Sequence, residues 1–197
     1  MEVKTIAIIG AGTAGREIAR AAALAGFRTI LEDVSSVTRE HAIAWIRESL
    51  QEATARGKGS PQQKDAALAR LSTARSIEEA CREADLIIEA APEEMEIKIE
   101  IFTILDKFAK PGAIFASNAI SLAITEMAEI TFCPEKCVGM RFFHSAPKMK
   151  LLEITRAPHT SDDTVETCRE VGRCMGKEVV VVQESPEFLA KRAETLP

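Results

Sequence analysis

Short hydrophobic runs alternate along the chain with longer segments whose apolar residues recur at helical spacing. The first run, Thr5–Ile9, is almost continuously apolar and ends in glycine, which is typical of a strand buried on both faces. The alanine-rich residues 16–25 predict a helix after it, and Gly26 is a natural terminator. The same pattern predicts further strands at 28–33, 86–89, 113–117, 137–143, 151–155 and 179–182.

Helices are predicted between these strands. Capping signals mark helix starts at residues 60–63 and 76–79. Apolar stripes at helical spacing run through residues 41–53, 97–108 and 165–175, and residues 188–196 begin a last helix. Strands alternating with helices of this length indicate βαβ units. The fold class we predict is therefore α/β, with a mainly parallel, doubly wound sheet that carries helices on both faces.

Composition narrows the class of protein. Hydrophobic residues make up 46% of the 197 residues and charged residues 28%, as expected of a globular chain. The net charge of −5 disfavours nucleic acid as a partner, and the apolar runs fall short of the ~18–20 residues that a membrane span needs. The first residues lack a signal-peptide layout, and the five scattered cysteines suit reduced thiols. We therefore predict a cytoplasmic protein with no nucleic-acid or membrane partner.

A glycine-rich loop predicts a dinucleotide site. It joins the first strand to the first helix and reads G-x-G-x-x-G, and Asp33 ends the next predicted strand, as in a Rossmann-type fold. The helix N-terminus supplies free N–H groups for phosphates. Asp33 is expected to accept from the adenosine ribose hydroxyls, and with Glu32 beside it a 2′-phosphate would meet like charge, so NAD is favoured over NADP. The loop residues expected to contact NAD are Gly10, Gly12, Thr13, Ala14 and Gly15.

Four further segments carry recognisable sequence. They read LIIEAAPE at 86–93, ASN at 116–118, PKMKLLE at 147–153 and SP at 185–186. With the glycine loop they resemble the N-terminal NAD-binding domain of the 3-hydroxyacyl-CoA dehydrogenase family, which includes 3-hydroxybutyryl-CoA dehydrogenase. The resemblance runs from Ile6 to Arg192. It implies NAD-dependent oxidation of the 3-hydroxyl group of an acyl-CoA in fatty-acid or butyrate metabolism.

The resemblance also implies site residues. Glu93 and Lys98 match positions that contact the cofactor in the family, and Asn118 matches the position at the nicotinamide end. Ser49 and Arg56 fall where the family contacts CoA. The residues alone leave a second interpretation open, because charged side chains are usually exposed. In that interpretation Glu93 and Lys98 are solvated helix charges and Arg56 is a surface arginine.

The positions that match the family's catalytic residues are altered. The family uses a histidine as base, oriented by a glutamate, with a serine and an asparagine around the substrate oxygen. The glutamate is present as Glu153, whereas the histidine, serine and asparagine positions hold Arg141, Ile120 and Lys191. A guanidinium stays protonated in proteins and has no acceptor lone pair, so Arg141 cannot be the base.

Three interpretations of the altered positions stay open. We favour an ion pair between Arg141 and Glu153, which leaves neither charge uncompensated. In the second, His144 serves as a relocated base. In the third, Arg141 binds an anionic group of a different substrate through its planar guanidinium. We predict no metal site, because Cys133 and Cys137 with His144 lack a fourth ligand.

Three hypotheses of function follow. The first is an NAD-binding protein of this family that is weak or inactive as a dehydrogenase on its own. The second is an active NAD-dependent oxidoreductase on a 3-hydroxyacyl-CoA or related hydroxy substrate. The third is the NAD-binding half of a split enzyme. We place the NAD-binding domain at residues 1–184 and read 185–197 as the shortened start of the family's helical domain, so the expected partners are NAD(H), acyl-CoA, and either a second copy or a separate helical chain.

Overall fold

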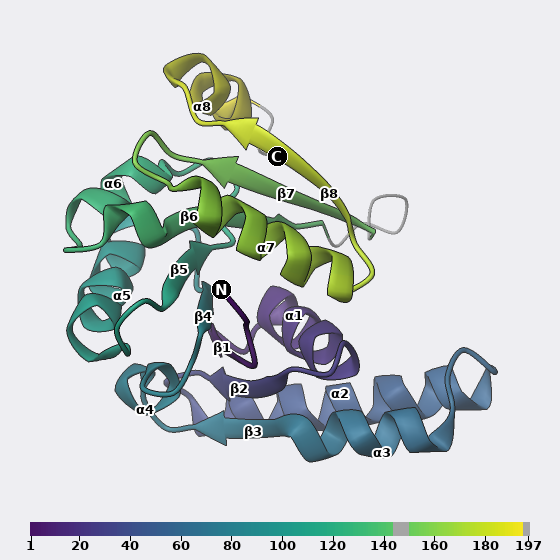
Figure 1. Ribbon diagram of the computed structural model, residues 1–197. Helices are drawn as coiled ribbons and strands as arrows, with labels where there is room; N and C mark the ends of the chain where they lie inside the picture. Colours follow the sequence, from purple (N-terminus) through teal and green to yellow (C-terminus); the bar gives the residue numbers. More distant parts are fainter. Residues whose placement is uncertain (144–149, 195–197) are drawn as a thin grey trace.

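The strands form one twisted sheet with helices on both faces (Figure 1). The computed structural model describes residues 1–143 and 150–194 of the chain. Within these residues the strand order is β3-β2-β1-β4-β5-β6-β7-β8, and every neighbouring pair is parallel except β6 and β7. The first six strands have the order of the Rossmann fold. The predicted fold class is confirmed.

The helices and strands follow one another along the chain as the hydrophobic pattern predicts. The strands are β1 (Thr5–Ile9), β2 (Arg28–Glu32), β3 (Leu71–Ala74), β4 (Leu86–Glu89), β5 (Ile114–Ser117), β6 (Cys137–Phe142), β7 (Leu151–Arg156) and β8 (Glu178–Gln183). The α-helices are α1 (Thr13–Leu24), α2 (Ser36–Ala55), α3 (Pro61–Arg70), α4 (Ile77–Cys81), α5 (Met95–Phe108), α6 (Ile124–Glu129), α7 (Asp162–Cys174) and α8 (Pro186–Ala193).

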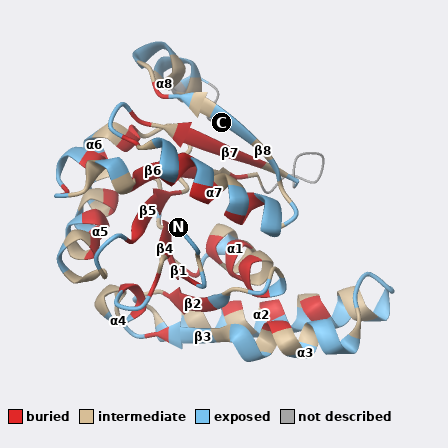
Figure 2. Cartoon of the chain, in the orientation of Figure 1, coloured by how far each residue is buried: buried red, intermediate tan, exposed pale blue. Residues whose placement is uncertain are grey.

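The core is divided into two layers by the sheet. Alternate residues of β1 point to opposite faces, so Ile6 and Ile8 pack beneath α1, α2, α3 and α7, while Ala7 and Ile9 pack beneath α4, α5 and α6. Figure 2 shows the middle strands as buried and β8 as mostly exposed. The apolar stripe predicted for α5 is on its buried side, where Ile101 and Leu105 are 5% and 0% exposed.

Local sequence accounts for most helix starts. Ser60 and Gln63 form the predicted capping box at the start of α3, with Pro61 at the first helical position. Ser76 accepts a hydrogen bond from Glu79 N at the start of α4. Helix α2 begins five residues before its predicted stripe, at Ser36, because Ser35 caps it through Thr38 N.

Strand β3, helix α6 and a short 3₁₀ helix at Pro134–Lys136 were not predicted. Strand β3 lies at the edge of the sheet with its Ser72 and Thr73 exposed, so it has no apolar alternation to mark it. Helix α6 receives its cap from Glu184, whose carboxylate accepts from Ile124 N at 2.7 Å and Thr125 N at 3.1 Å across 59 or more residues of sequence. In the part of the chain that the structure describes, no helix is both long and apolar enough to cross a membrane.

Candidate functional site

The glycine loop lies at the carboxyl end of β1, between the ends of β2 and β4. Gly10 N donates to Glu32 O and Ala90 N donates to Ile9 O, both at 2.8 Å, so the loop is fastened to both neighbouring strands. Gly10 has φ +102°, and a Cβ there would lie 2.7 Å from Ala90 O. A Cβ at Gly15 would lie 1.7 Å from Gly10 O. The tight turn and the close approach of α1 to the loop therefore both require glycine.

Gly12 differs from these two glycines. Its backbone is extended, with φ −65° and ψ −167°, and a Cβ built there meets no described atom within 4 Å. The protein's own packing thus leaves open the space above Gly12, directly at the N-terminus of α1. Free N–H groups and the positive end of the helix dipole face this space, and these features suit a pyrophosphate. The cradle fits a dinucleotide.

Asp33 lies beside the loop with its carboxylate held in place by the backbone. Its Oδ2 accepts from Ala11 N and its Oδ1 from Ser35 N, each at 2.9 Å. Arg39 donates from its guanidinium to the Asp33 carbonyl. These bonds fix the direction of a carboxylate that can still accept from ribose hydroxyls through its remaining lone pairs.

A cavity of about 560 Å³ opens between Asp33 and the loop after β4. Its volume falls in the usual range for small-molecule sites. Glu32 lines it and is 2% exposed. Burial, and next the neighbouring Asp33 carboxylate, raise the pKa of Glu32 from 4.5 to about 7. Most of the remaining wall is apolar and comes from Ile9, Ile77, Ile97, Ile101 and Ile104.

Lys98 is buried rather than solvated, contrary to the second interpretation of its position. It is 1% exposed, and its Nζ lies 2.8 and 2.9 Å from the two carboxylate oxygens of Glu89, which is fully buried. Glu89 also accepts from Ala91 N and from the Ser117 hydroxyl. The pair joins α5 to the end of β4 and supports the loop from beneath.

Glu93 connects two loops at the carboxyl edge of the sheet. Its Oε1 accepts from Ile120 N at 2.7 Å and Ser121 N at 2.9 Å, and its Oε2 lies 3.8 Å from Lys98 Nζ. Asn118, on the same loop as Ile120, accepts through Oδ1 from Phe142 N at 2.8 Å. Glu93 and Asn118 therefore position the loop that follows β5.

Of the positions that the resemblance matches to catalytic residues, Arg141 lies on β6 and Glu153 on β7. Arg141 and Glu153 are directly opposite one another in the antiparallel register. Glu153 is 8% exposed and pairs with Arg192, whose other guanidinium nitrogen donates to Ile120 O at 3.0 Å. The Arg141 guanidinium instead stacks 4.5 Å from the centre of the Phe143 ring.

The predicted ion pair between Arg141 and Glu153 is therefore wrong, because Glu153 pairs with Arg192 instead. Cross-strand pairing places the two side chains on one face, but Arg192 of α8 occupies the carboxylate. Burial, and next the like charge of Arg192, lower the pKa of Arg141, whereas Glu153 and Glu93 raise it. Arg141 remains charged, because a guanidinium keeps its proton in proteins.

Two residues of the site were missed by sequence reasoning. Glu89 carried a signal, since an acidic residue at the end of an apolar strand needs a buried partner. Arg192 carried none, because it lies 39 residues from Glu153 in the chain. Lys191, the neighbouring position that the family resemblance singled out, is exposed on α8. His144 and residues 147–149 of the PKMKLLE segment lie outside the described residues.

Ser49 and Arg56, the two predicted contacts to CoA, lie in different surroundings. Ser49 on α2 lines a hollow of about 250 Å³. Arg56 lies two turns further along, with its side chain 69% exposed and paired with Glu52 at 3.1 Å. Burial lowers the pKa of Arg20 and of Lys177, which both line the hollow. The other residues of the hollow are Glu17, Ile18, Ala21, Trp45, Phe142 and Phe143.

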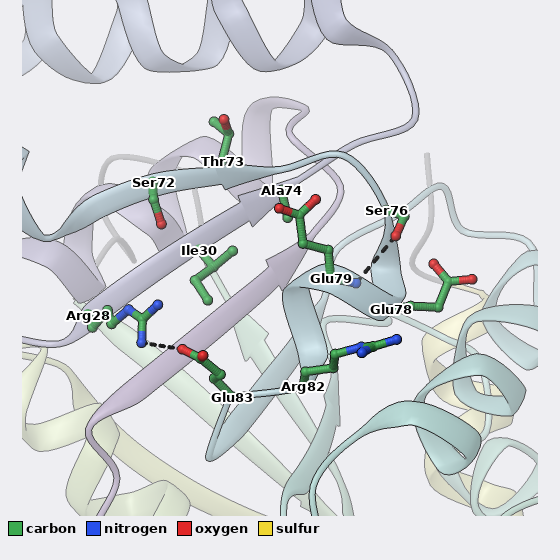
Figure 3. Close-up of a pocket in the computed structure, with 10 residues that line it drawn as sticks. All are labelled: Arg28, Ile30, Ser72, Thr73, Ala74, Ser76, Glu78, Glu79, Arg82 and Glu83. Carbon is green, nitrogen blue, oxygen red and sulfur yellow. Dashed lines mark hydrogen bonds and ion pairs between the residues drawn. The ribbon is translucent and has the colours of Figure 1, made fainter.

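A third hollow, of about 570 Å³, lies between β3 and α4 (Figure 3). Arg28 and Glu83 pair across it at 2.5 Å, with side chains 56% and 63% exposed. Glu79 accepts from Arg75 N at 2.8 Å, and Ser76 accepts from Glu79 N (Figure 3). Two pairs of its polar residues thus bond with each other at the surface, whereas no described hydrogen bond reaches the side chain of Glu32 in the cavity beside the glycine loop.

Known proteins share this fold and sequence. The family model of the 3-hydroxyacyl-CoA dehydrogenase NAD-binding domain matches residues 5–185. A Bacillus subtilis protein named "Probable 3-hydroxybutyryl-CoA dehydrogenase" is 37% identical over 98% of this chain and 67% of its own length. The 3-hydroxybutyryl-CoA dehydrogenase of Bradyrhizobium diazoefficiens is 36% identical over 96% of this chain and 64% of its own.

A solved structure agrees with these relatives. The crystal structure of 3-hydroxybutyryl-CoA dehydrogenase from Escherichia coli K12 superposes with a TM-score of 0.91 at 35% identity. The superposition covers 98% of this chain and 40% of the Escherichia coli chain. The chain thus spans about two thirds of its curated relatives' length or less. It belongs to the 3-hydroxyacyl-CoA dehydrogenase family and matches the family's NAD-binding domain, with NAD as the cofactor.

Proposed function

We propose that the chain binds NAD(H) between the glycine loop and Asp33, and that on its own it is weak or inactive as a 3-hydroxyacyl-CoA dehydrogenase. Bound NAD would supply the hydride acceptor for oxidation of a hydroxyl carbon. The chain's own task is to orient that hydroxyl and take its proton.

The observation that carries the proposal is the guanidinium of Arg141 opposite Glu153. A base that takes a hydroxyl proton needs an acceptor lone pair, and Arg141 has none. Glu153 carries lone pairs, but its carboxylate is already paired with Arg192. Loss of a positioned base lowers the rate by about 10²–10⁴.

The test compares NADH oxidation in the presence of acetoacetyl-CoA by the unaltered chain and by the double variant Arg141→His, Ile120→Ser. We expect the unaltered chain to bind NADH, as seen by NADH fluorescence, but to oxidise it at a rate about 10²–10⁴ below that of a competent dehydrogenase. The double variant is expected to gain turnover. Arg156→His, on the same strand as Glu153 but paired with Asp162 at the surface, is the matched control and should gain none.

Turnover by the unaltered chain at the rate of the double variant or above would contradict the proposal. That outcome would support the second candidate, an active oxidoreductase on a 3-hydroxyacyl-CoA or related hydroxy substrate. The hollow beside Ser49 favours this candidate, because the cations Arg20 and Lys177 outnumber the single carboxylate of Glu17 there and acyl-CoA carries phosphates.

A third candidate is the NAD-binding half of an enzyme completed by a helical chain or a second copy. The exposed valines of β8 favour it, since Val180 and Val181 are 43% and 37% exposed on an edge strand. Turnover that appears only when a co-purifying helical chain is present would support this candidate over the first. Localisation in the cytoplasm and a place in fatty-acid metabolism remain parts of the proposal.

A further inference from the structure

The carboxyl group of Glu32 is a buried acid in a mostly apolar cavity. It belongs to the last residue of β2, is 2% exposed, and lines the 560 Å³ cavity that borders the glycine loop. Four isoleucines of α4 and α5 form much of the opposite wall. A polar group in such surroundings is costly unless it is hydrogen-bonded.

Among the described residues, no hydrogen bond reaches the Glu32 side chain. The neighbouring Asp33 contrasts with it, because both Asp33 carboxylate oxygens accept backbone N–H groups at 2.9 Å. Glu32 is bonded only through its backbone, where its carbonyl accepts from Gly10 N. Neither carboxylate oxygen of Glu32 is among the described side-chain atoms that are both sealed from solvent and without a partner, so the group opens into the cavity. A ligand in the cavity would meet it there.

The position of the cavity indicates which part of NAD would meet Glu32. The pyrophosphate belongs at Gly12 and the ribose at Asp33, so the apolar space beyond Asp33 is the place for the adenine ring. The edge of adenine presents an N6 amino donor beside a ring-nitrogen acceptor. A neutral carboxylic acid offers one donor, which suits the ring nitrogen, and one acceptor, which suits the N6 amino group. A carboxylate offers acceptors only.

The charged groups around Glu32 favour its neutral form. Asp33 and Glu78 raise its pKa by repulsion and Arg39 lowers it, while burial is the largest cause of the rise to about 7. Glu100 adds a further acidic side chain to the cavity wall. The acid and the carboxylate are therefore both populated near neutral pH.

We propose that Glu32 binds the adenine edge as a neutral acid, donating to a ring nitrogen and accepting from the N6 amino group. The inference rests on the cofactor site of the proposed function and specifies how that site recognises its base. Where Glu32 is ionised in the free protein, binding takes up one proton from solvent onto its carboxylate. Affinity for NADH is then coupled to pH.

The experiment measures the Kd of NADH by fluorescence between pH 6.5 and 9 for the unaltered chain and for Glu32→Gln. For the unaltered chain we expect the Kd to be constant below about 7 and to rise up to tenfold per pH unit above it, because the ionised form must first be protonated. Glutamine also donates and accepts, so Glu32→Gln should bind tightly with little dependence on pH. Glu100→Gln is the matched control and should keep the dependence. Glu78→Gln should keep it with an onset at lower pH, because Glu78 is one cause of the raised pKa of Glu32.

Calorimetry of NADH binding to the unaltered chain at pH 8, in two buffers of different ionisation enthalpy, measures the proton directly. Uptake of close to one proton is expected, and it should vanish in Glu32→Gln. A pH-independent Kd for the unaltered chain, or a dependence that survives Glu32→Gln, would overturn the inference while leaving NAD binding intact. Failure to bind NADH at every pH would instead overturn the cofactor site itself, and the inference with it.

Discussion

Lys98 illustrates what a single residue contributes to this site. Its ammonium lies within 2.9 Å of both Glu89 oxygens while 1% of the side chain is exposed. The pair anchors α5 to the end of β4 beneath the loop that lines the cavity. Buried ion pairs add little net stability, but removing one partner leaves an uncompensated charge in the interior.

Lys98→Met is therefore expected to lower the free energy of unfolding by about 3–5 kcal/mol. Chemical denaturation monitored by circular dichroism measures the loss. Arg56→Met is the matched control, because it removes an exposed pair with Glu52 and should cost less than about 1 kcal/mol. The double variant Lys98→Met, Glu89→Gln should recover part of the loss. A loss no greater than that of the control would contradict a stabilising role for the buried pair.

Neither the burial of Lys98 nor its pairing with Glu89 was predicted from the sequence. Lys98 precedes Ile101, Phe102 and Leu105 by three, four and seven residues, which places it on the buried face of α5. Helical spacing was thus a signal of burial that the default exposure of charged side chains outweighed. The identity of the partner depends on where β4 ends relative to α5, and spacing within one helix does not contain that information.

At the scale of elements, the strand–loop–helix unit of β1 and α1 depends on its glycines for different reasons. Gly15 lets α1 approach the loop, where an added Cβ would be 1.7 Å from Gly10 O. Gly12 keeps open a space that no described atom fills within 4 Å of a Cβ. The first glycine is required by the fold, and the second leaves the space in which we propose that the pyrophosphate binds.

Substitutions at these two positions should separate folding from binding. Gly12→Val is expected to leave the circular dichroism spectrum and the melting temperature nearly unchanged, and to weaken NADH binding by at least about tenfold, or 1.4 kcal/mol. Gly15→Ala is expected to destabilise the fold, since the atom that the new Cβ would meet, Gly10 O, belongs to the backbone and cannot move away alone. Unchanged NADH affinity in Gly12→Val would contradict placement of the pyrophosphate at the start of α1.

Helices and strands could be predicted from the sequence where nearby residues determine them. Seven of the strands are predicted by apolar runs, and the capping box at Ser60 marks the start of α3 correctly. Strand β3 and helix α6 depend on distant parts of the chain. The first forms by pairing with β2, and the second is capped by Glu184.

At the scale of the whole molecule, the site is assembled where the carboxyl ends of β1, β2, β4 and β5 meet beside the ends of β6 and β7. The parallel order places the ends of the first strands at one edge, as the sequence pattern predicts. Alternation and register bring Arg141 and Glu153 together. The arrival of Arg192 from α8 on Glu153 is a property of the complete fold, and for that reason the predicted ion pair had the wrong partner.

The hydrogen bonds of Glu93 connect the loop that lines the cavity to the loop that follows β5. Glu93 follows Ala90, Ala91 and Pro92, which line the cavity, and it holds the amides of Ile120 and Ser121 beside Asn118. An adenosine fragment such as ADP-ribose should therefore slow amide hydrogen exchange at Ile120 and Ser121 without touching them. Hydrogen-exchange mass spectrometry measures this protection, and Glu93→Ala should abolish it. Equal exchange with and without ADP-ribose would mean that the loop after β5 does not respond to the adenosine half of the dinucleotide. Protection would mean that binding of the adenosine half rigidifies the loop that we propose receives the nicotinamide half.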